Sequence, residues 1–206
     1  MKKIFIVTTL FLQISTSFAL SPALEYNDDE LQWANFMAQS SYIVDYSNSP
    51  EKYRLNDSIT RREVMKVIAN IAGAEFWDTC EWKFSDVKSS DWGCKYIERA
   101  LSIGIVANNT NFRPNDSISK AEALKMLLKV RGVEKTSDTG NWQADYVKTA
   151  FSNKWYETEW SDYNTAASRG WIFMSGNRII NNIQVEQIWE IDDTQAILDE
   201  LFDFLK

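Results

Sequence analysis

Two stretches of the chain read almost alike: YRLNDSITRRE at residues 53–63 and FRPNDSISKAE at residues 112–122. The second stretch follows the first at a constant offset of 59 residues. A repeat of this size predicts small structural units that bury their apolar faces against one another. It also favours a binding surface over a single catalytic pocket.

Each stretch ends in a capping box, the pattern that starts a helix. In this pattern a hydroxyl accepts a hydrogen bond from the N–H three residues later, and a glutamate at that position reaches back to the first N–H. The two boxes are Thr60 with Glu63 and Ser119 with Glu122. Apolar residues at helical spacing follow each box up to a glycine, which predicts two amphipathic helices.

Another helix is expected ahead of each of these loops. In the second copy the apolar face predicts a helix from Trp92 that ends in a left-handed residue at Gly104. In the first copy we expect a helix roughly from Asp29 to Val44, with Ile43 at the place of Ile105.

A third copy is degraded. Trp142 and Tyr146 repeat two aromatic residues of the second copy 50 positions later, and Ser168-Arg169-Gly170-Trp171 falls where the capped helix should begin. The glutamate of the box is missing there, and Gly170 raises the cost of a helix by about 1 kcal/mol.

The N-terminal residues predict a secretory signal peptide. Lys2 and Lys3 precede an apolar run, and Ser17-Phe18-Ala19 offers small residues for cleavage after Ala19. The alternative, a membrane anchor, needs about 20 apolar residues, and this run is shorter. We therefore expect a secreted protein of the bacterial cell surface or envelope, with no membrane insertion after cleavage.

The charge and residue composition exclude several functions. The formal net charge of −7 becomes −9 without Lys2 and Lys3, which argues against nucleic-acid partners. The chain has no histidine, so the usual general base and the commonest zinc ligand are missing. The two cysteines, Cys80 and Cys94, are expected to form a disulfide in an oxidising compartment.

The combination of motifs resembles the S-layer homology domain. The resemblance depends on the motifs Phe84-Ser85-Asp86-Val87, Trp92, Gly104-Ile105-Val106, Phe112-Arg113-Pro114 and Ser119-Lys120-Ala121-Glu122. The resemblance is strong for residues 84–132, good for 53–73 and weak for 142–173. It implies a mainly α fold with three helix-loop-helix repeats in a pseudo-threefold prism around a central helix bundle. The expected organisation is a signal peptide at 1–19, units at 28–73, 84–132 and 142–182, and a C-terminal amphipathic helix at 183–206.

The resemblance also implies non-covalent attachment to a cell-envelope polysaccharide that carries an acidic sugar. By position, the basic residues that contact this acid are Arg61, Lys120 and Arg169. Each is expected at the start of a helix, where exposed N–H groups and the helix dipole favour an anion. The alternative is that Thr60, Glu63, Ser119 and Glu122 explain the motif by capping alone and that the basic side chains are solvated.

Other polar and aromatic residues have competing interpretations. Asp57, Asp86 and Asp116 fit turns better than a catalytic or calcium site. Trp92 and Trp142 are expected in the core. Trp155 and Trp160, in a polar stretch, are candidates for a sugar platform, with packing on the third unit as the alternative. The C-terminal run is expected to fold back on the repeats or to mediate self-association.

Three functions follow. The first is a surface-anchoring module that binds the acidic polysaccharide. The second is an exported module that has lost glycan binding and binds other surface proteins. An enzyme is the weakest option, because only a paired-carboxylate hydrolase is feasible without histidine and no such pair stands out. We expect no catalytic residues, no metal and no cofactor.

Overall fold

The computed structural model describes residues 28–74 and 80–184. The elements within these ranges are α1 (Asp28–Gln39), the short 3₁₀ helix η1 (Pro50–Tyr53), α2 (Arg61–Ile71), α3 (Cys94–Ser102), α4 (Lys120–Arg131), α5 (Trp142–Ser152) and α6 (Arg169–Ile180). No strand occurs in these ranges, so the predicted mainly α class is confirmed. The expected signal peptide, and the expected C-terminal helix from residue 185 onward, lie outside the described residues.

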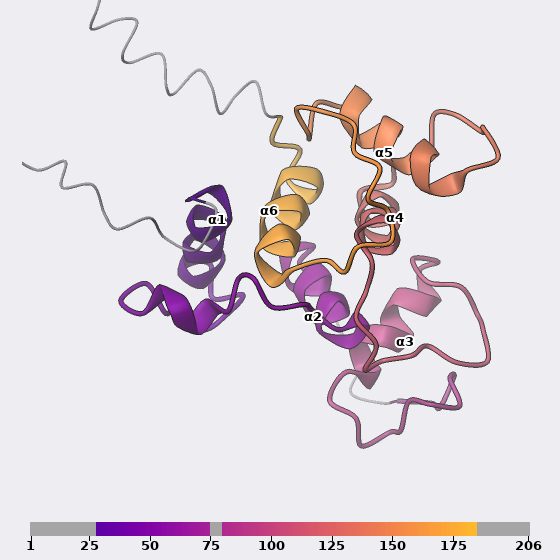
Figure 1. The fold of residues 1–206 in the computed structure, drawn as a ribbon. Coiled ribbons are helices and arrows are strands. Elements are labelled where there is room, and N and C mark those ends of the chain that lie inside the picture. Colours follow the sequence, from indigo (N-terminus) through magenta and orange to yellow (C-terminus); the bar gives the residue numbers. More distant parts are fainter. Residues whose placement is uncertain (1–27, 75–79, 185–206) are drawn as a thin grey trace, which may run out of the picture.

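The helices pair across repeats rather than within them. The first helix of each repeat packs against the second helix of the preceding one: α3 on α2, α5 on α4, and α1 on α6, which closes the cycle (Figure 1). The second helices α2, α4 and α6 also contact one another. No repeat therefore buries its apolar face alone, as the repeat pattern predicted.

A ring of three backbone hydrogen bonds joins the repeats just before these second helices. The N–H of Ile59 donates to the carbonyl of Ala167 at 3.1 Å, Ala167 donates to Ile118 at 2.8 Å, and Ile118 donates to Ile59 at 3.1 Å. All three side chains are fully buried. The ring places the starts of α2, α4 and α6 side by side and satisfies backbone groups that water cannot reach.

The first N–H group of each second helix is also bonded across a repeat boundary. The bonds run from Arg61 to the carbonyl of Asp116, from Lys120 to that of Thr165 and from Arg169 to that of Asp57, each at 2.9 Å. The next N–H in each helix is bonded in the same way. The expectation of exposed N–H groups for an anion is therefore wrong, because loops of the neighbouring repeats use these donors.

Both predicted capping boxes are present. The hydroxyls of Thr60 and Ser119 accept from the N–H groups of Glu63 and Glu122, whose carboxylates accept in return. Ser168 caps α6 through the N–H of Trp171 alone, so the third box is incomplete as predicted.

The register of the first repeat differs from the prediction. Helix α1 ends at Gln39, and the chain turns at Ser41, which has a φ of 60°. The N–H of Tyr42 then donates to Met37, as that of Ile105 donates to Ala100. Tyr42, and not Ile43, is thus the counterpart of Ile105. Ser40 and Ser41 favour such a turn because serine competes with the helical hydrogen bonds.

Helix α6 is buried on almost all sides, and its glycines allow close packing. Ile172 and Phe173 are fully buried. A Cβ on Gly176 would lie 2.8 Å from Cδ1 of Ile71, and one on Gly170 would overlap the carboxylate of Glu30. Gly170 lowers the helix propensity of α6, but it allows α6 to pack closely against Glu30 of α1.

Candidate functional site

Two hollows on the surface lie at equivalent positions of the repeat. The first, which we call groove 1, has a volume of about 320 Å³, and the second, groove 2, about 200 Å³. Groove 1 is lined by Tyr42, Tyr53, Glu63, Lys66, Trp92 and Arg169, among others. Groove 2 is lined by their counterparts Ile105, Phe112, Glu122, Lys125, Trp142 and Arg61. Each groove thus draws residues from all three repeats.

Arg61 lines groove 2, is largely buried and forms two side-chain hydrogen bonds within the protein. It is 8% exposed, its Nε donates to the carbonyl of Phe112 at 2.9 Å, and its Nη1 donates to Oε1 of Glu122 at 3.1 Å. The guanidinium also lies 4.9 Å from the centre of the Phe112 ring. Burial lowers the pKa of Arg61, because the charged guanidinium is partly removed from water.

Arg169 has the same role in groove 1. Its Nε donates to the carbonyl of Tyr53 at 3.0 Å, and its Nη1 lies 3.6 Å from Oε1 of Glu63. Arg61 and Arg169 are therefore ties between neighbouring repeats. They line the grooves that the resemblance implies, and each uses its Nε and Nη1 groups in contacts with a neighbouring repeat. Their role as direct glycan contacts stays a prediction.

Lys120, the third predicted contact, lies in a different environment. Its Nζ donates to Oδ2 of Asp162 at 2.7 Å and lies 5.9 Å from the ring of Trp160. In the third repeat, α6 carries Trp171 at the position where α2 and α4 have the capping glutamate. Lys120 therefore lacks the glutamate partner that Arg61 and Arg169 have.

Aromatic side chains occupy the corresponding region of the third repeat. Trp171 stacks on Tyr156 with 6.2 Å between ring centroids and an interplanar angle of 14°, and it meets Trp160 edge-on at 6.1 Å. The Tyr156 hydroxyl donates to Ser175, and burial raises the pKa of Tyr156. Trp155 is 1% exposed, so it offers no face to a sugar. The platform predicted at Trp155 and Trp160 is therefore contradicted for Trp155, and Trp160 packs against the core.

Trp92 and Trp142 lie on the surface, contrary to the expectation that they are core residues. They are 48% and 39% exposed, and each indole forms a wall of a groove. The ammonium group of Lys66 lies 5.7 Å from the Trp92 ring, and that of Lys125 lies 5.0 Å from the Trp142 ring. Sequence analysis missed both lysines, although they occupy the same place in the repeat, three residues after the capping glutamate.

The two lysines carry charge that the fold does not neutralise. Within residues 28–74 and 80–184, no carboxylate forms an ion pair with Lys66 or Lys125. Burial lowers the pKa of Lys125, and the nearby cations Lys129 and Lys135 lower it further. A bound anion would stabilise a partly buried ammonium group that lies among other cations.

Trp92 is held by side chains on α2. Arg62 lies 5.0 Å from its ring and donates to Asp91 at 2.9 Å and to Asn115 at 2.7 Å. Gly93 makes room for this arrangement, because a Cβ there would overlap the Cγ of Arg62. These contacts hold the indole in place beside groove 1.

Aspartates of the repeat have structural roles, as predicted. Both carboxylate oxygens of Asp86 accept from backbone N–H groups, at Phe112 and Arg113, and Asp57 pairs with Arg54.

The predicted disulfide between Cys80 and Cys94 is present, with 5.9 Å between the Cα atoms. Among the described residues, no helix has the length and apolar character needed to cross a bilayer.

Comparison with known proteins supports the resemblance. Residues 83–124 match the model of the S-layer homology domain, which confirms it for the second repeat. An amylopullulanase of Thermoanaerobacterium thermosulfurigenes is 32% identical over 56% of this chain and 6% of its own length. The exoglucanase XynX of Acetivibrio thermocellus is 29% identical over 58% of the chain and 11% of its own. The middle cell wall protein of Brevibacillus brevis is 27% identical over 71% of the chain and 14% of its own.

The chain thus spans only 6–14% of the length of these relatives. What is similar is a small part of each relative. The catalytic activities in the names of the first two proteins therefore do not transfer to this chain.

Proposed function

We propose that this chain attaches non-covalently to an acidic polysaccharide of the cell envelope and that grooves 1 and 2 are its binding sites. The observation that carries the proposal is the repeated pair of an exposed tryptophan and a lysine that has no ion pair among the described residues, Lys66 with Trp92 and Lys125 with Trp142. The match to the S-layer homology domain and the similarity to a cell wall protein support the same function.

Each groove offers two complementary contacts to such a ligand. The ammonium group binds a carboxylate or similar anion on the sugar, and the indole stacks on the apolar face of the sugar ring. Arg61 and Arg169 add positive charge below the groove, and Glu63 and Glu122 orient them. The anion contacts are therefore assigned first to Lys66 and Lys125.

The two grooves differ in lining. Groove 1 carries Tyr42 and Tyr53, where groove 2 carries Ile105 and Phe112. One polymer that occupies both grooves gains avidity, because the second contact becomes intramolecular. In the third repeat Trp171 and Met174 replace the glutamate and the lysine, so we assign no third anion site.

Sedimentation with purified cell-wall fragments tests the proposal. We expect the protein to sediment with intact fragments and to stay in solution after acid treatment strips the acidic polymer. Lys66→Ala combined with Lys125→Ala should weaken binding at least tenfold, because charge-assisted contacts contribute about 1.5–3 kcal/mol each. The matched control is Lys88→Ala with Lys148→Ala, which removes the same charge from exposed positions outside both grooves.

Two outcomes would contradict this assignment. Undiminished binding by the double variant would place the site elsewhere on the surface. Failure of the wild-type protein to bind either type of fragment would favour the alternative of an interaction with other exported proteins.

A further inference from the structure

Trp82 is the most exposed large apolar side chain of the described residues, with an exposed fraction of 68%. Its backbone is left-handed, with a φ of 62°. Residues with a Cβ rarely adopt this conformation, and a bulky aromatic residue there is an outlier. The position therefore combines unfavourable exposure with unfavourable backbone geometry.

Other left-handed residues of the described chain recur with the repeat, and Trp82 does not. Ser41, Gly104 and Lys154 end the first helices, and Gly73, Gly132 and Asn182 end the second helices. Arg54 and Arg113 occupy the same place in two loops. Gly140 is also left-handed, but glycine adopts this conformation without cost. The turn at Trp82 is therefore an addition to the repeat architecture.

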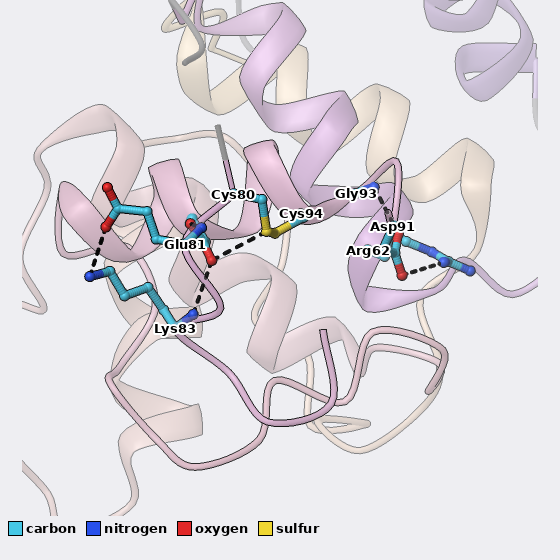
Figure 2. The surroundings of a disulfide bond; sticks show 8 residues. Arg62, Cys80, Glu81, Lys83, Asp91, Gly93 and Cys94 are labelled. Carbon is cyan, nitrogen blue, oxygen red and sulfur yellow. Dashed lines mark hydrogen bonds and ion pairs between the residues drawn. A yellow bond between two sulfur atoms is a disulfide. The ribbon is translucent and has the colours of Figure 1, made fainter. Parts of the chain in front are cut away.

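A buried carboxylate on α3 imposes this conformation. Glu98, which is 7% exposed, accepts from the N–H of Glu81 at 2.7 Å and from the N–H of Lys83 at 3.0 Å (Figure 2). Trp82 lies between these two donors, so the chain must turn there to bring both to one carboxylate. The indole is thereby directed away from the core.

The disulfide fixes the same turn from the other side. Cys80 begins the turn and is joined to Cys94, the first residue of α3, one helical turn before Glu98 (Figure 2). An ion pair of 2.9 Å between Lys83 and Glu81 links the two residues that flank Trp82. The turn is thus attached to α3 at three points. The fold thus holds an aromatic residue in a left-handed conformation with 68% of its surface exposed, which indicates a role in binding.

We propose that Trp82 is a stacking platform for a sugar ring of the polysaccharide outside the two grooves. The side chains beside the indole are a charged pair, which a large apolar protein partner would have to dehydrate at a cost. A sugar has one apolar face for the indole and hydroxyl groups that can hydrogen-bond to Glu81 and Lys83. This inference rests on the proposed function of grooves 1 and 2.

A third hollow lies between groove 1 and Cys80, the first residue of this turn. It has a volume of about 450 Å³ and is lined by Cys80, Cys94, Ser90, Lys66 and Trp92, among others. Lys66 and Trp92 also line groove 1, so the two hollows share a wall. A polysaccharide that leaves groove 1 past Trp92 can cross this hollow, past the disulfide that lines it, towards the turn that carries Trp82.

Titration of the purified protein with soluble polysaccharide released from cell walls tests the inference. Trp82→Gly should lower affinity roughly threefold to tenfold, as expected for the loss of one stacking contact. The same variant should unfold at an equal or higher temperature, because glycine relieves the left-handed strain. Trp82→Tyr keeps an aromatic face and should bind nearly as tightly as the wild type. Phe36→Ala, at an exposed aromatic residue outside both grooves, is the matched control.

The results separate this inference from the proposed function. If the wild type binds and Trp82→Gly binds equally well, the platform is wrong and the grooves are unaffected. A lower unfolding temperature for Trp82→Gly together with weaker binding would assign Trp82 a structural role and overturn the inference. If the wild type does not bind the polysaccharide, the proposed function fails and the role of Trp82 fails with it.

Discussion

Nη1 of Arg61 donates a hydrogen bond of 3.1 Å to Oε1 of Glu122, and this bond joins the first turn of α2 to the first turn of α4. Glu122 also completes its own capping box. Burial alone would raise the pKa of Glu122, but the N–H of Ser119 and the cations Arg61 and Arg113 outweigh burial and lower it. One carboxylate thus supports both a helix start and a contact between repeats.

Arg61→Ala should therefore destabilise the fold before it affects any ligand. We expect a loss of about 2–4 kcal/mol in the free energy of unfolding, since the change removes a buried pair and leaves the carbonyl of Phe112 without its donor. Urea denaturation followed by circular dichroism measures this loss. The control is Arg113→Ala, which removes the exposed partner of Glu122 and should cost less than about 1 kcal/mol. Lost glycan binding with unchanged stability would instead restore Arg61 as a direct contact.

The caps of α2 and α6 should contribute different amounts to the free energy of unfolding. The hydroxyl of Thr60 makes two bonds with Glu63, since it accepts from the N–H and donates to the carboxylate, whereas the hydroxyl of Ser168 accepts only from the N–H of Trp171. We expect Thr60→Ala to cost about 1–2 kcal/mol and Ser168→Ala about 0.5–1 kcal/mol. Equal losses in urea denaturation would mean that the carboxylate contributes nothing to the cap.

Local patterns in the sequence were sufficient to predict the capped helices. Thr60 with Glu63 and Ser119 with Glu122 specify their caps from residues that are neighbours in sequence, and Gly104 marks the end of α3. The disulfide was also predictable, because the chain contains only two cysteines. The caps depend on residues that are close together in the sequence, so their pattern can be recognised without knowledge of the fold.

The exposure of the tryptophans could not be derived in this way. Trp92 and Trp155 both occur near helices, but whether an indole is buried depends on which repeat packs over it. Trp92 precedes α3 and contacts Arg62 on α2 of another repeat, while Trp155 is 1% exposed. The donors at the helix starts were misjudged for the same reason, because the carbonyls that bind them belong to residues far away in the sequence.

Loss of the disulfide should lower stability without melting α3. The bond joins cysteines 14 positions apart in the sequence, so replacement of Cys80 and Cys94 by serine should cost about 3 kcal/mol. Helix content should be retained, because Glu98 still binds the N–H groups of Glu81 and Lys83. Urea unfolding of the wild type with and without reductant provides an independent comparison. Equal stability in all of these samples would show that the disulfide does not constrain the unfolded chain.

Lys125 should make binding at groove 2 sensitive to alkaline pH. Burial, together with Lys129 and Lys135, lowers the pKa of Lys125 in the free protein, so the ammonium group loses its proton at a lower pH than an ordinary lysine. An anion binds the protonated form, so affinity is full below this lowered pKa. It should fall by about tenfold for each pH unit above it.

The stability of the free protein should change in the opposite direction. Between the lowered pKa and the ordinary lysine value, the unfolded chain binds more protons than the folded one, so the contribution of Lys125 to stability increases as the pH rises. Lys125→Arg separates the two effects, because a guanidinium group stays charged throughout this range. Titration of a Lys66→Ala protein, which leaves groove 2 as the site, should show affinity that declines with pH for Lys125 and stays level for Arg at that position. An equal decline in both would assign the pH dependence to another group.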